Sequence, residues 1–256
     1  MGRRKENHIM SKSFEMAQSY PLEVEKAKKE GWAVLLPVGT MEYHSTHCPY
    51  GCDTLVAQGV CERVAKETNA MILPPVWYGV ASYAVGGPET NTLNVDCDTI
   101  EAYIYCILKS LFLSGFKKNI FIVIAHQTED YMPMTLACMK AAKKLIMADM
   151  EETGGYGWWG KNENRDFFEN LSETDNPWNK IRCVLLPCTK SSPTIGDHAG
   201  VYECSMLEAL YPGTIKLDRL KDSKDWFAET AKDMNLEIGQ EMVDAAVKDI
   251  LEMING

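Results

Sequence analysis

The sequence has no long apolar run and no excess of positive charge, and each absence excludes a class of protein. No stretch of about 18 apolar residues occurs, which is the length that a membrane-spanning helix needs. The basic start of the chain lacks the apolar segment that follows it in a secretory signal. Lysine and arginine number 26 against 36 aspartates and glutamates, so the net charge is -10. We therefore expect a cytoplasmic protein that binds neither nucleic acid nor a membrane and acts on a small neutral or polar molecule.

The nine cysteines lack the regular spacing of a disulfide framework. Their number is odd, and a chain of 256 residues that is 46% apolar buries enough surface to fold without covalent links. A free cysteine is most often a small buried apolar residue. We therefore interpret the cysteines as reduced core residues. The alternative is a cysteine-dependent enzyme with Cys48, Cys52 or Cys204 as its nucleophile.

Short apolar runs alternate with helical patterns along the chain, which is typical of an α/β fold. The apolar runs predict strands at 32–38, 71–76, 119–125 and 182–187. The helical patterns predict helices at 54–68, 99–114, 133–150 and 201–210, and one or two more within 223–255. We expect one domain over residues 1–256, with α/β/α layers around a mostly parallel central sheet.

The segment 154–180 interrupts this alternation. It is rich in glycine, asparagine and acidic residues, yet it contains three tryptophans and two phenylalanines. Loops of this length within a compact domain usually have a function. We interpret the segment as an aromatic-rich insertion or lid, and its aromatic residues would also suit an oligomer contact.

Four of the five histidines lie in segments that follow predicted strands. His44 and His47 come after the first strand, His126 after the third and His198 after the fourth, while His8 lies near the start of the chain. In a parallel α/β sheet, ligands bind outside the carboxyl ends of the strands. The sequence therefore predicts that these histidines meet at one edge of the sheet and form a site there.

Carboxylates accompany the first pair of histidines. Glu42 and His44 are two residues apart, so on an extended segment both side chains point the same way. Asp53 begins the next predicted helix, where its two oxygens could bridge two ions. Carboxylate and imidazole are ligands of zinc, manganese and iron, and catalytic sites of this kind keep one position for water. The alternative is that Asp53 only caps the helix, Glu42 is solvated and His44 packs under a turn.

Acidic residues also follow the third strand. Gln127 and Glu129 come directly after His126, and Glu129 could bind a metal or cap the following helix. We prefer a ligand role for His126, because it marks the point where an entirely apolar strand ends.

The fourth strand is followed by a segment rich in small residues. Asp197 and His198 stand beside an alanine and a glycine, which would let a ligand approach the backbone closely. Glu203 lies at the start of the next predicted helix and is a possible additional ligand. The alternative is that Asp197 caps this helix and that Glu203 complements its dipole.

Three segments together resemble the creatininase (creatinine amidohydrolase) family, whose pattern reads P-x-G-S-x-E-x-H-G-x-H-L-P-x-x-T-D-T and later H-A-G-x-x-E-T-S. They are Pro37-Val-Gly-Thr-Met-Glu-Tyr-His44, Pro49-Tyr-Gly-Cys-Asp-Thr54 and Asp197-His-Ala-Gly-Val-Tyr-Glu-Cys-Ser205. The likeness extends from about residue 32 to 210. It implies an α/β/α layer domain with a parallel sheet, two divalent metal ions and a homo-oligomer, often a hexamer.

The resemblance also assigns roles to residues. Glu42, Asp53 and His126 match the ligands of one ion, and His44 with the shared Asp53 those of the other. The glutamate that completes the second ion site in creatininase matches Thr128 here, so a different acid has to replace it. The possible replacements are Glu129 and Glu203. Residues expected to orient a ligand or to contact substrate are His47, Ser82, Gln127 and Asp197.

The expected reaction follows from the metals and one mobile base. Water whose pKa is lowered by divalent ions attacks a polarised carbonyl carbon, and His198 carries a proton to the leaving nitrogen. A tryptophan and an aspartate that hold substrate in creatininase correspond to Thr194 and Ile195 here, so we do not expect creatinine itself. We expect a hydrolase of a cyclic amide or similar small polar ring. The alternatives are a keto-inositol or formamide hydrolase of the same family, or a non-catalytic ligand-binding relative.

Overall fold

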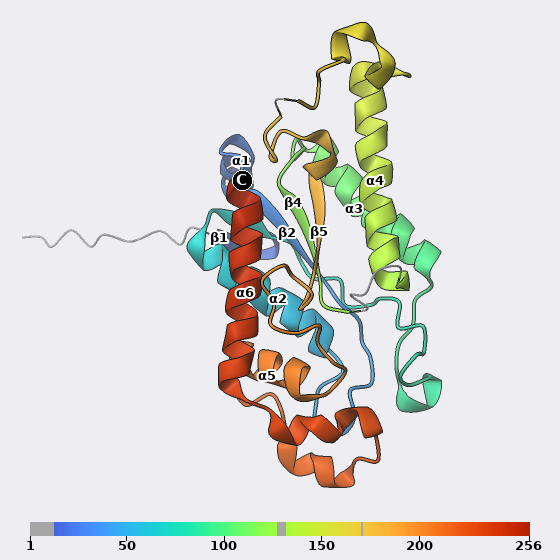
Figure 1. The fold of residues 1–256 in the computed structure, drawn as a ribbon, viewed down its shortest axis with the longest axis vertical. Coiled ribbons are helices and arrows are strands. Elements are labelled where there is room, and N and C mark those ends of the chain that lie inside the picture. Colours follow the sequence, from blue (N-terminus) through green and yellow to red (C-terminus); the bar gives the residue numbers. More distant parts are fainter. Residues whose placement is uncertain (1–12, 127–131, 170) are drawn as a thin grey trace, which may run out of the picture.

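The computed structural model describes residues 13–126, 132–169 and 171–256, and it shows helices on both faces of a parallel sheet (Figure 1). The strands are β1 (Ser13–Glu15), β2 (Ala33–Val38), β3 (Ala70–Ile72), β4 (Ile120–Ile124) and β5 (Ile181–Leu185). Their order is β1-β3-β2-β4-β5, and every pairing is parallel. The predicted fold class is confirmed. Strand β1, at one edge of the sheet, was not predicted because three residues are too few to show a period.

The α-helices cover the sheet in two layers. They are α1 (Pro21–Lys29), α2 (Cys52–Glu67), α3 (Cys97–Leu113), α4 (Pro133–Gly154), α5 (Val201–Leu210) and α6 (Leu236–Asn255). Short 3-10 helices lie at Met16–Gln18, Pro88–Thr90, Trp158–Gly160, Asn162–Asn164, Pro177–Asn179, Leu217–Asp222 and Trp226–Asp233. Within the described residues, no helix is both long enough and apolar enough to cross a membrane.

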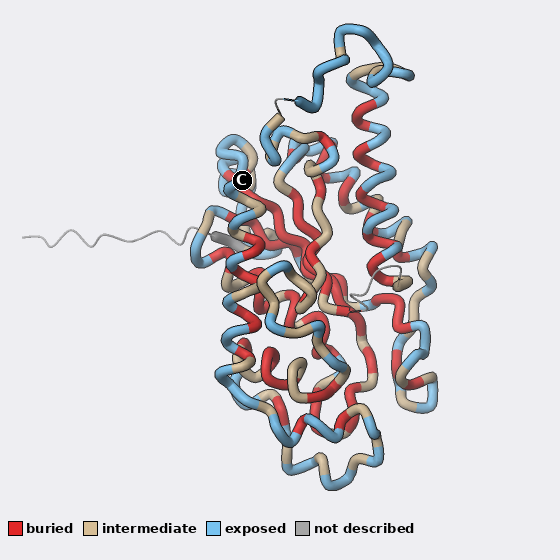
Figure 2. The backbone as a smooth tube through the Cα atoms, viewed as in Figure 1, coloured by how far each residue is buried: buried red, intermediate tan, exposed pale blue. Residues whose placement is uncertain are grey.

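The core lies on both sides of the two central strands. Every residue of β2 and β4 is buried (Figure 2). Alternate side chains of β2 enter opposite layers: Val34 and Leu36 pack with α3 and α4, whereas Leu35 packs with α2, α5 and α6. This two-sided burial explains why β2 and β4 are apolar throughout rather than alternating.

The strand register makes β2, β4 and β5 end side by side, at the same edge of the sheet. Ile124, the last residue of β4, pairs with Val38 at the end of β2 and with Leu185 at the end of β5. The segments that follow these strands therefore leave the sheet side by side. Gly39, directly after β2, lies so close to α2 that an added Cβ would be 2.4 Å from the backbone nitrogen of Thr54. Only glycine allows this approach, which sets the loop against the first turn of α2.

The segment 154–180 lies at the other end of the sheet. It follows the C-terminal end of α4, far from the loops after β2 and β4 (Figure 1). Its aromatic side chains form a cluster in which the Trp158 ring lies 5.2 Å from Phe167 and 6.2 Å from Phe168. The interpretation as an insertion or lid stays a prediction, as does the single domain over 1–256.

Candidate metal centre

Four of the predicted site residues meet at the carboxyl end of the sheet. Glu42 and His44 come from the loop after β2, Asp53 from the first turn of α2, and His126 lies two residues beyond β4. All four are buried. The structure therefore brings together, from three separate segments, the acids and imidazoles that the sequence analysis singled out.

The first group of donors surrounds the His126 ring. Its Nδ1 atom lies 3.0 Å from Asp53 Oδ2 and 3.3 Å from Glu42 Oε2. The ligand atoms of all three residues lie within 4.8 Å of one another. Two carboxylates and an imidazole at this spacing are suited to one divalent ion.

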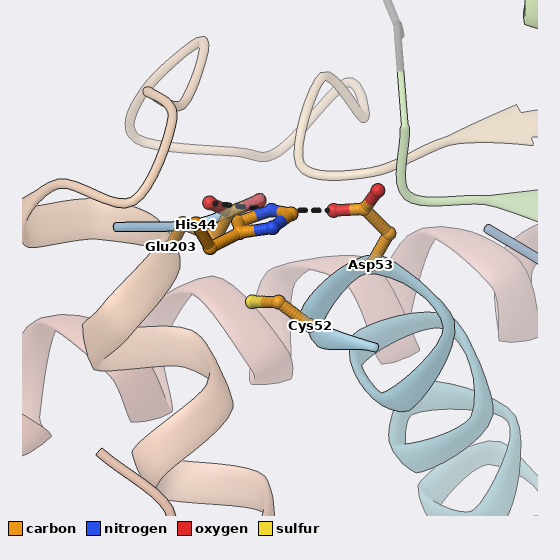
Figure 3. A group of neighbouring side chains, drawn as sticks. All are labelled: His44, Cys52, Asp53 and Glu203. Atoms are coloured by element: carbon orange, nitrogen blue, oxygen red, sulfur yellow. Dashed lines mark hydrogen bonds and ion pairs between the residues drawn. The ribbon is translucent and has the colours of Figure 1, made fainter. Parts of the chain in front are cut away.

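The second group surrounds the His44 ring (Figure 3). The Nε2 atom of His44 lies 3.0 Å from Asp53 Oδ1 and 3.5 Å from Glu203 Oε2. Asp53 thus turns one oxygen toward each imidazole, the arrangement expected of a carboxylate that bridges two ions. Of the two predicted replacement acids, Glu203 is at the site, whereas Glu129 lies outside the described residues.

Backbone carbonyls fix the orientation of the imidazole rings. His44 Nδ1 donates a hydrogen bond to the carbonyl of Glu42 at 2.9 Å, and His126 Nε2 donates to the carbonyl of Val80 at 2.9 Å. Each ring therefore presents its other nitrogen to the carboxylates. Metal-binding histidines characteristically use one ring N–H in this way, which sets the tautomer and the direction of the free nitrogen.

Burial and the neighbouring charges shift the pKa values of the four groups in the centre. Burial raises the pKa of Glu42 to about 7. Burial opposes ionisation of Asp53 as well, but the adjacent His44 and His126 hold its pKa below the usual range. At His44 burial is outweighed by Glu203 and Asp53, which raise the pKa of the ring. At His126 burial is outweighed by Asp53 in the same way, so its pKa is raised too.

Two buried oxygens point to cations in this centre. Among the described residues, the only hydrogen-bond donor that faces Glu42 Oε2 and Asp53 Oδ2 is the His126 nitrogen. A buried carboxylate oxygen needs a hydrogen bond or a cation, because losing its hydration is costly. The residues present therefore fit divalent metal ions.

His198 lies at the opening of the centre. Its Nε2 atom donates to the carbonyl of Tyr43 at 3.0 Å, which turns Nδ1 toward Glu42 Oε2 at 3.9 Å. The centre of the ring lies 4.3 Å from that of His44, with the two planes tilted by 35°, and 5.2 Å from that of Phe227 in an edge-on contact. Burial and the neighbouring His44 lower the pKa of His198, so the ring is neutral near pH 7 and Nδ1 can accept a proton. The following residue, Ala199, has a left-handed backbone (φ 50°), a strained conformation of the kind that clusters at functional sites.

A cavity of about 320 Å³ opens onto this centre. Its apolar wall includes Val85, Met132, Leu186 and Pro187, and its polar wall is formed by the acids and imidazoles of the centre. Among the described residues that line it there is no lysine or arginine. The cavity therefore suits a small ligand without a phosphate group.

The remaining predicted residues have supporting positions. The Asp197 carboxylate accepts hydrogen bonds from the backbone N–H groups of Tyr202 and Glu203 at 3.0 and 2.9 Å, so it caps the start of α5. His47 is buried below the centre and donates to the carbonyl of Ala199 at 3.0 Å. Both residues therefore position the loop that carries His198.

The contacts with substrate that the sequence predicts for Ser82 and Gln127 stay predictions. Ser82 is exposed in a turn with φ 57°, where its backbone N–H donates to Asn94, and it does not line the cavity. This turn places Val85 rather than Ser82 at the cavity wall. Gln127 and Thr128 lie outside the described residues.

Sequence reasoning missed two supports of the centre. Phe227, on the 3-10 helix Trp226–Asp233, contacts His198 from a part of the chain that has no motif. Cys52 is buried in the core as predicted, and it also lies beside the centre, which its position next to Asp53 could have signalled. Burial raises the pKa of the Cys52 thiol, which counts against the alternative of a cysteine nucleophile.

Comparisons with known proteins agree with this geometry. The family model described as "Creatininase: Creatinine amidohydrolase" matches residues 18–254. Creatinine amidohydrolase of Pseudomonas putida is 27% identical over 219 residues, covering 83% of this chain and 78% of the relative. A 3-dehydro-scyllo-inosose hydrolase of Thermotoga maritima is 29% identical over 104 residues, covering 40% of this chain and 32% of the relative.

Solved creatininase structures share the fold. A manganese form has a TM-score of 0.71 at 20% identity and covers 95% of this chain and 98% of its own. A mutant of the Zn-Zn type has a TM-score of 0.69 at 19% identity and covers 94% and 96%.

Proposed function

The chain belongs to the creatininase family, and from this premise we propose that this hydrolase uses two divalent metal ions to break a carbon–nitrogen bond in a cyclic amide or similar small polar ring. The observation that carries the proposal is the position of Asp53. Its two carboxylate oxygens face two different imidazoles, each at 3.0 Å. A carboxylate that only capped a helix would accept hydrogen bonds from backbone N–H groups and would not need to lie between two histidines.

We assign the ligands from the two donor groups. Glu42, Asp53 and His126 would hold one ion, and His44, Asp53 and Glu203 the other. Bound there, zinc, manganese or iron would supply a nucleophile from water near neutral pH and would polarise a carbonyl group. Hydrogen bonds to backbone carbonyls fix the two imidazole rings, so that their free nitrogens stay directed at the proposed ions together with the buried carboxylates.

His198 is the residue that moves the proton in this proposal. Its Nδ1 atom is directed at the centre and its other ring nitrogen is bound to the carbonyl of Tyr43. The neutral ring accepts a proton from the attacking water at Nδ1 and returns it to the nitrogen that leaves. The hydrogen bond to Tyr43 and the contact with Phe227 hold the ring in place through both steps.

The cavity favours a compact neutral substrate. Its volume of about 320 Å³ accommodates a small ring, and no cationic side chain lines it within the described part of the chain. A keto-inositol is the second candidate class, because the Thermotoga maritima relative acts on such a ring. We place the cyclic amide first, since the Pseudomonas putida relative matches about twice as much of the chain. The proposal includes a homo-oligomer, which sedimentation would measure.

A substrate screen with metal-loaded protein tests this function. Purified protein is stripped with a chelator, reloaded with Zn²⁺ or Mn²⁺, and assayed against lactams, cyclic ureas, formamides and keto-inositols. We expect hydrolysis of a lactam or cyclic urea that is lost on chelation and restored by metal. Protein that binds no metal, or that binds two ions per chain and hydrolyses none of the four classes, would overturn the proposal and favour a non-catalytic relative.

A further inference from the structure

A buried thiol that the proposed mechanism does not use lies beside the second donor group. Cys52 is the first residue of α2, directly before Asp53, and it is fully buried. Its side chain extends from the first turn of the helix toward the space between His44 and Glu203 (Figure 3). One ligand atom from each of these residues lies within 4.8 Å of all the others: His44, Cys52, Asp53 and Glu203.

This donor set has the composition and spacing of a four-coordinate site. Zinc in proteins is bound tetrahedrally by imidazole, carboxylate and thiolate, with donors roughly 3 to 4 Å from one another. The group around His44 offers one imidazole, two carboxylates and one sulfur within 4.8 Å. The group around His126 contains no sulfur. The two halves of the centre therefore differ in the softness of their donors.

We propose that Cys52 is a thiolate ligand of the ion held by His44, Asp53 and Glu203, and that it makes this half of the centre prefer Zn²⁺ to Mn²⁺. This inference rests on the proposed function. When the ion binds, the sulfur–metal bond forms as the S–H bond breaks, and the proton leaves to solvent without any change of oxidation state. Thiolate ligands favour zinc, whereas manganese prefers oxygen donors.

Two further thiols lie near Cys52, and the Cys48 thiol shares hydrogen bonds with both Cys52 and Cys204. The Cys204 sulfur lies 3.3 Å from His47 Nε2 and 3.6 Å from the carbonyl oxygen of Ala199, below the centre. Among the described residues, neither Cys204 nor Cys48 belongs to a donor group with the acids of the centre. Cys52 is therefore the thiol for which the geometry supports coordination.

Cobalt substitution provides a readout that does not depend on activity. A thiolate bound to Co²⁺ produces a charge-transfer band in the near ultraviolet, whereas oxygen and nitrogen ligands do not. We expect this band in the wild-type protein loaded with Co²⁺ and its loss in Cys52→Ser. The matched control is Cys61→Ser, since Cys61 is buried in the same helix away from the centre, and it should keep the band. Zn²⁺ affinity should fall at least about tenfold in Cys52→Ser and not in Cys61→Ser, with Mn²⁺ affinity changed less in both.

X-ray absorption of the wild-type zinc form keeps the test decisive if Cys52→Ser does not fold. We expect a sulfur neighbour in the zinc coordination shell, retained in Cys204→Ser. A cobalt-loaded or zinc-loaded wild-type protein without a bound sulfur would overturn the inference while leaving a two-ion hydrolase intact. Protein that binds neither metal would overturn both the inference and the proposed function.

Discussion

The two donor groups that share Asp53 are built differently. In the group around His126, the acid and the imidazole come from the segments after β2 and β4, and their side chains are only 2% and 7% exposed. In the group around His44, the second acid comes from α5, and the Glu203 side chain is 14% exposed. The register of two central strands thus sets the first group, whereas the packing of a helix sets the second. We expect the ligands of the first group to be held more rigidly in position than those of the second group.

The supports of Glu203 illustrate this difference. Its carboxylate accepts a hydrogen bond from the backbone N–H of Ala199 at 2.6 Å, and its own N–H donates to the capping carboxylate of Asp197. The second group therefore depends on the same loop that carries His198. The position of Glu203 and that of the proton carrier are therefore linked through one loop, whereas that loop supplies no ligand to the first group and contacts it through His198.

Removing the shared carboxylate should have the largest effect, because it acts on both groups at once. In Asp53→Ala we expect the loss of both ions and of detectable hydrolysis, since each ion loses a charged ligand. Metal content after dialysis, measured by mass spectrometry, checks this outcome. The control is Asp96→Ala, which removes the cap of α3 on the surface and should leave the metal content unchanged. Full metal content in Asp53→Ala would show that the carboxylate does not bridge.

Replacing the proton carrier should separate catalysis from metal binding. In His198→Gln we expect both ions to remain and kcat to fall by roughly 10² to 10⁴, the usual contribution of a general base. The glutamine amide can still donate to the carbonyl of Tyr43, so the loop should keep its shape. The alternative is that His198 binds a metal ion, because its ring also lies within 4.8 Å of donor atoms of Glu42 and His44. Loss of one ion in this variant would make His198 a ligand rather than a base.

The elements of the fold that the sequence could predict are those with a continuous apolar run or a clear helical period. The strands β2 and β4 are continuous apolar runs, and the histidines directly after them indicated the edge of the sheet where the site lies. Strand β1 and helix α1 were not predicted. Three residues show no period, and α1 buries only Ala27 fully, so its pattern is weak. Local sequence is informative where burial is strong and regular, and much less so elsewhere.

The sequence predicted the ligands of the group around His126, but it left the second acid of the group around His44 undecided. Glu42, His44 and Asp53 lie within twelve consecutive residues, so one motif contained them. The choice between Glu129 and Glu203 could not be made, because it depends on how α5 packs against α2 and not on any local pattern. The contact between Phe227 and His198 also depends on tertiary packing, which a single sequence does not reveal.

Neutralising one acid from each group should expose the difference between them. In Glu42→Gln we expect the ion of the first group to bind roughly 10- to 100-fold more weakly, because its site is buried and water cannot replace the lost oxygen. In Glu203→Gln the loss should be smaller, since that side chain is partly exposed and His44 with Asp53 remains. Titration calorimetry of the metal-free variants measures both. A larger loss in Glu203→Gln would reverse the order of rigidity that we infer from the structure.

The pH dependence of metal binding should also differ between the groups, with a smaller effect. The pKa values of His44 and His126 are raised, so both rings carry protons that the ions must displace. Affinity for each ion therefore falls as pH falls, by about tenfold per pH unit for each proton displaced. Below about 7 Glu42 is protonated as well, so binding to the first group should weaken more steeply there.

Calorimetry between pH 6 and 8 can detect this change of slope. For the wild-type protein we expect the slope of log affinity against pH to increase below about 7 for the ion of the first group only. In Glu42→Gln the titrating group is gone, so the change of slope should disappear while the dependence on the imidazoles remains. If the slope instead steepened for the ion of the second group only, Glu42 would not be the acid that titrates near neutral pH, and the electrostatic difference that we infer between the halves would be wrong.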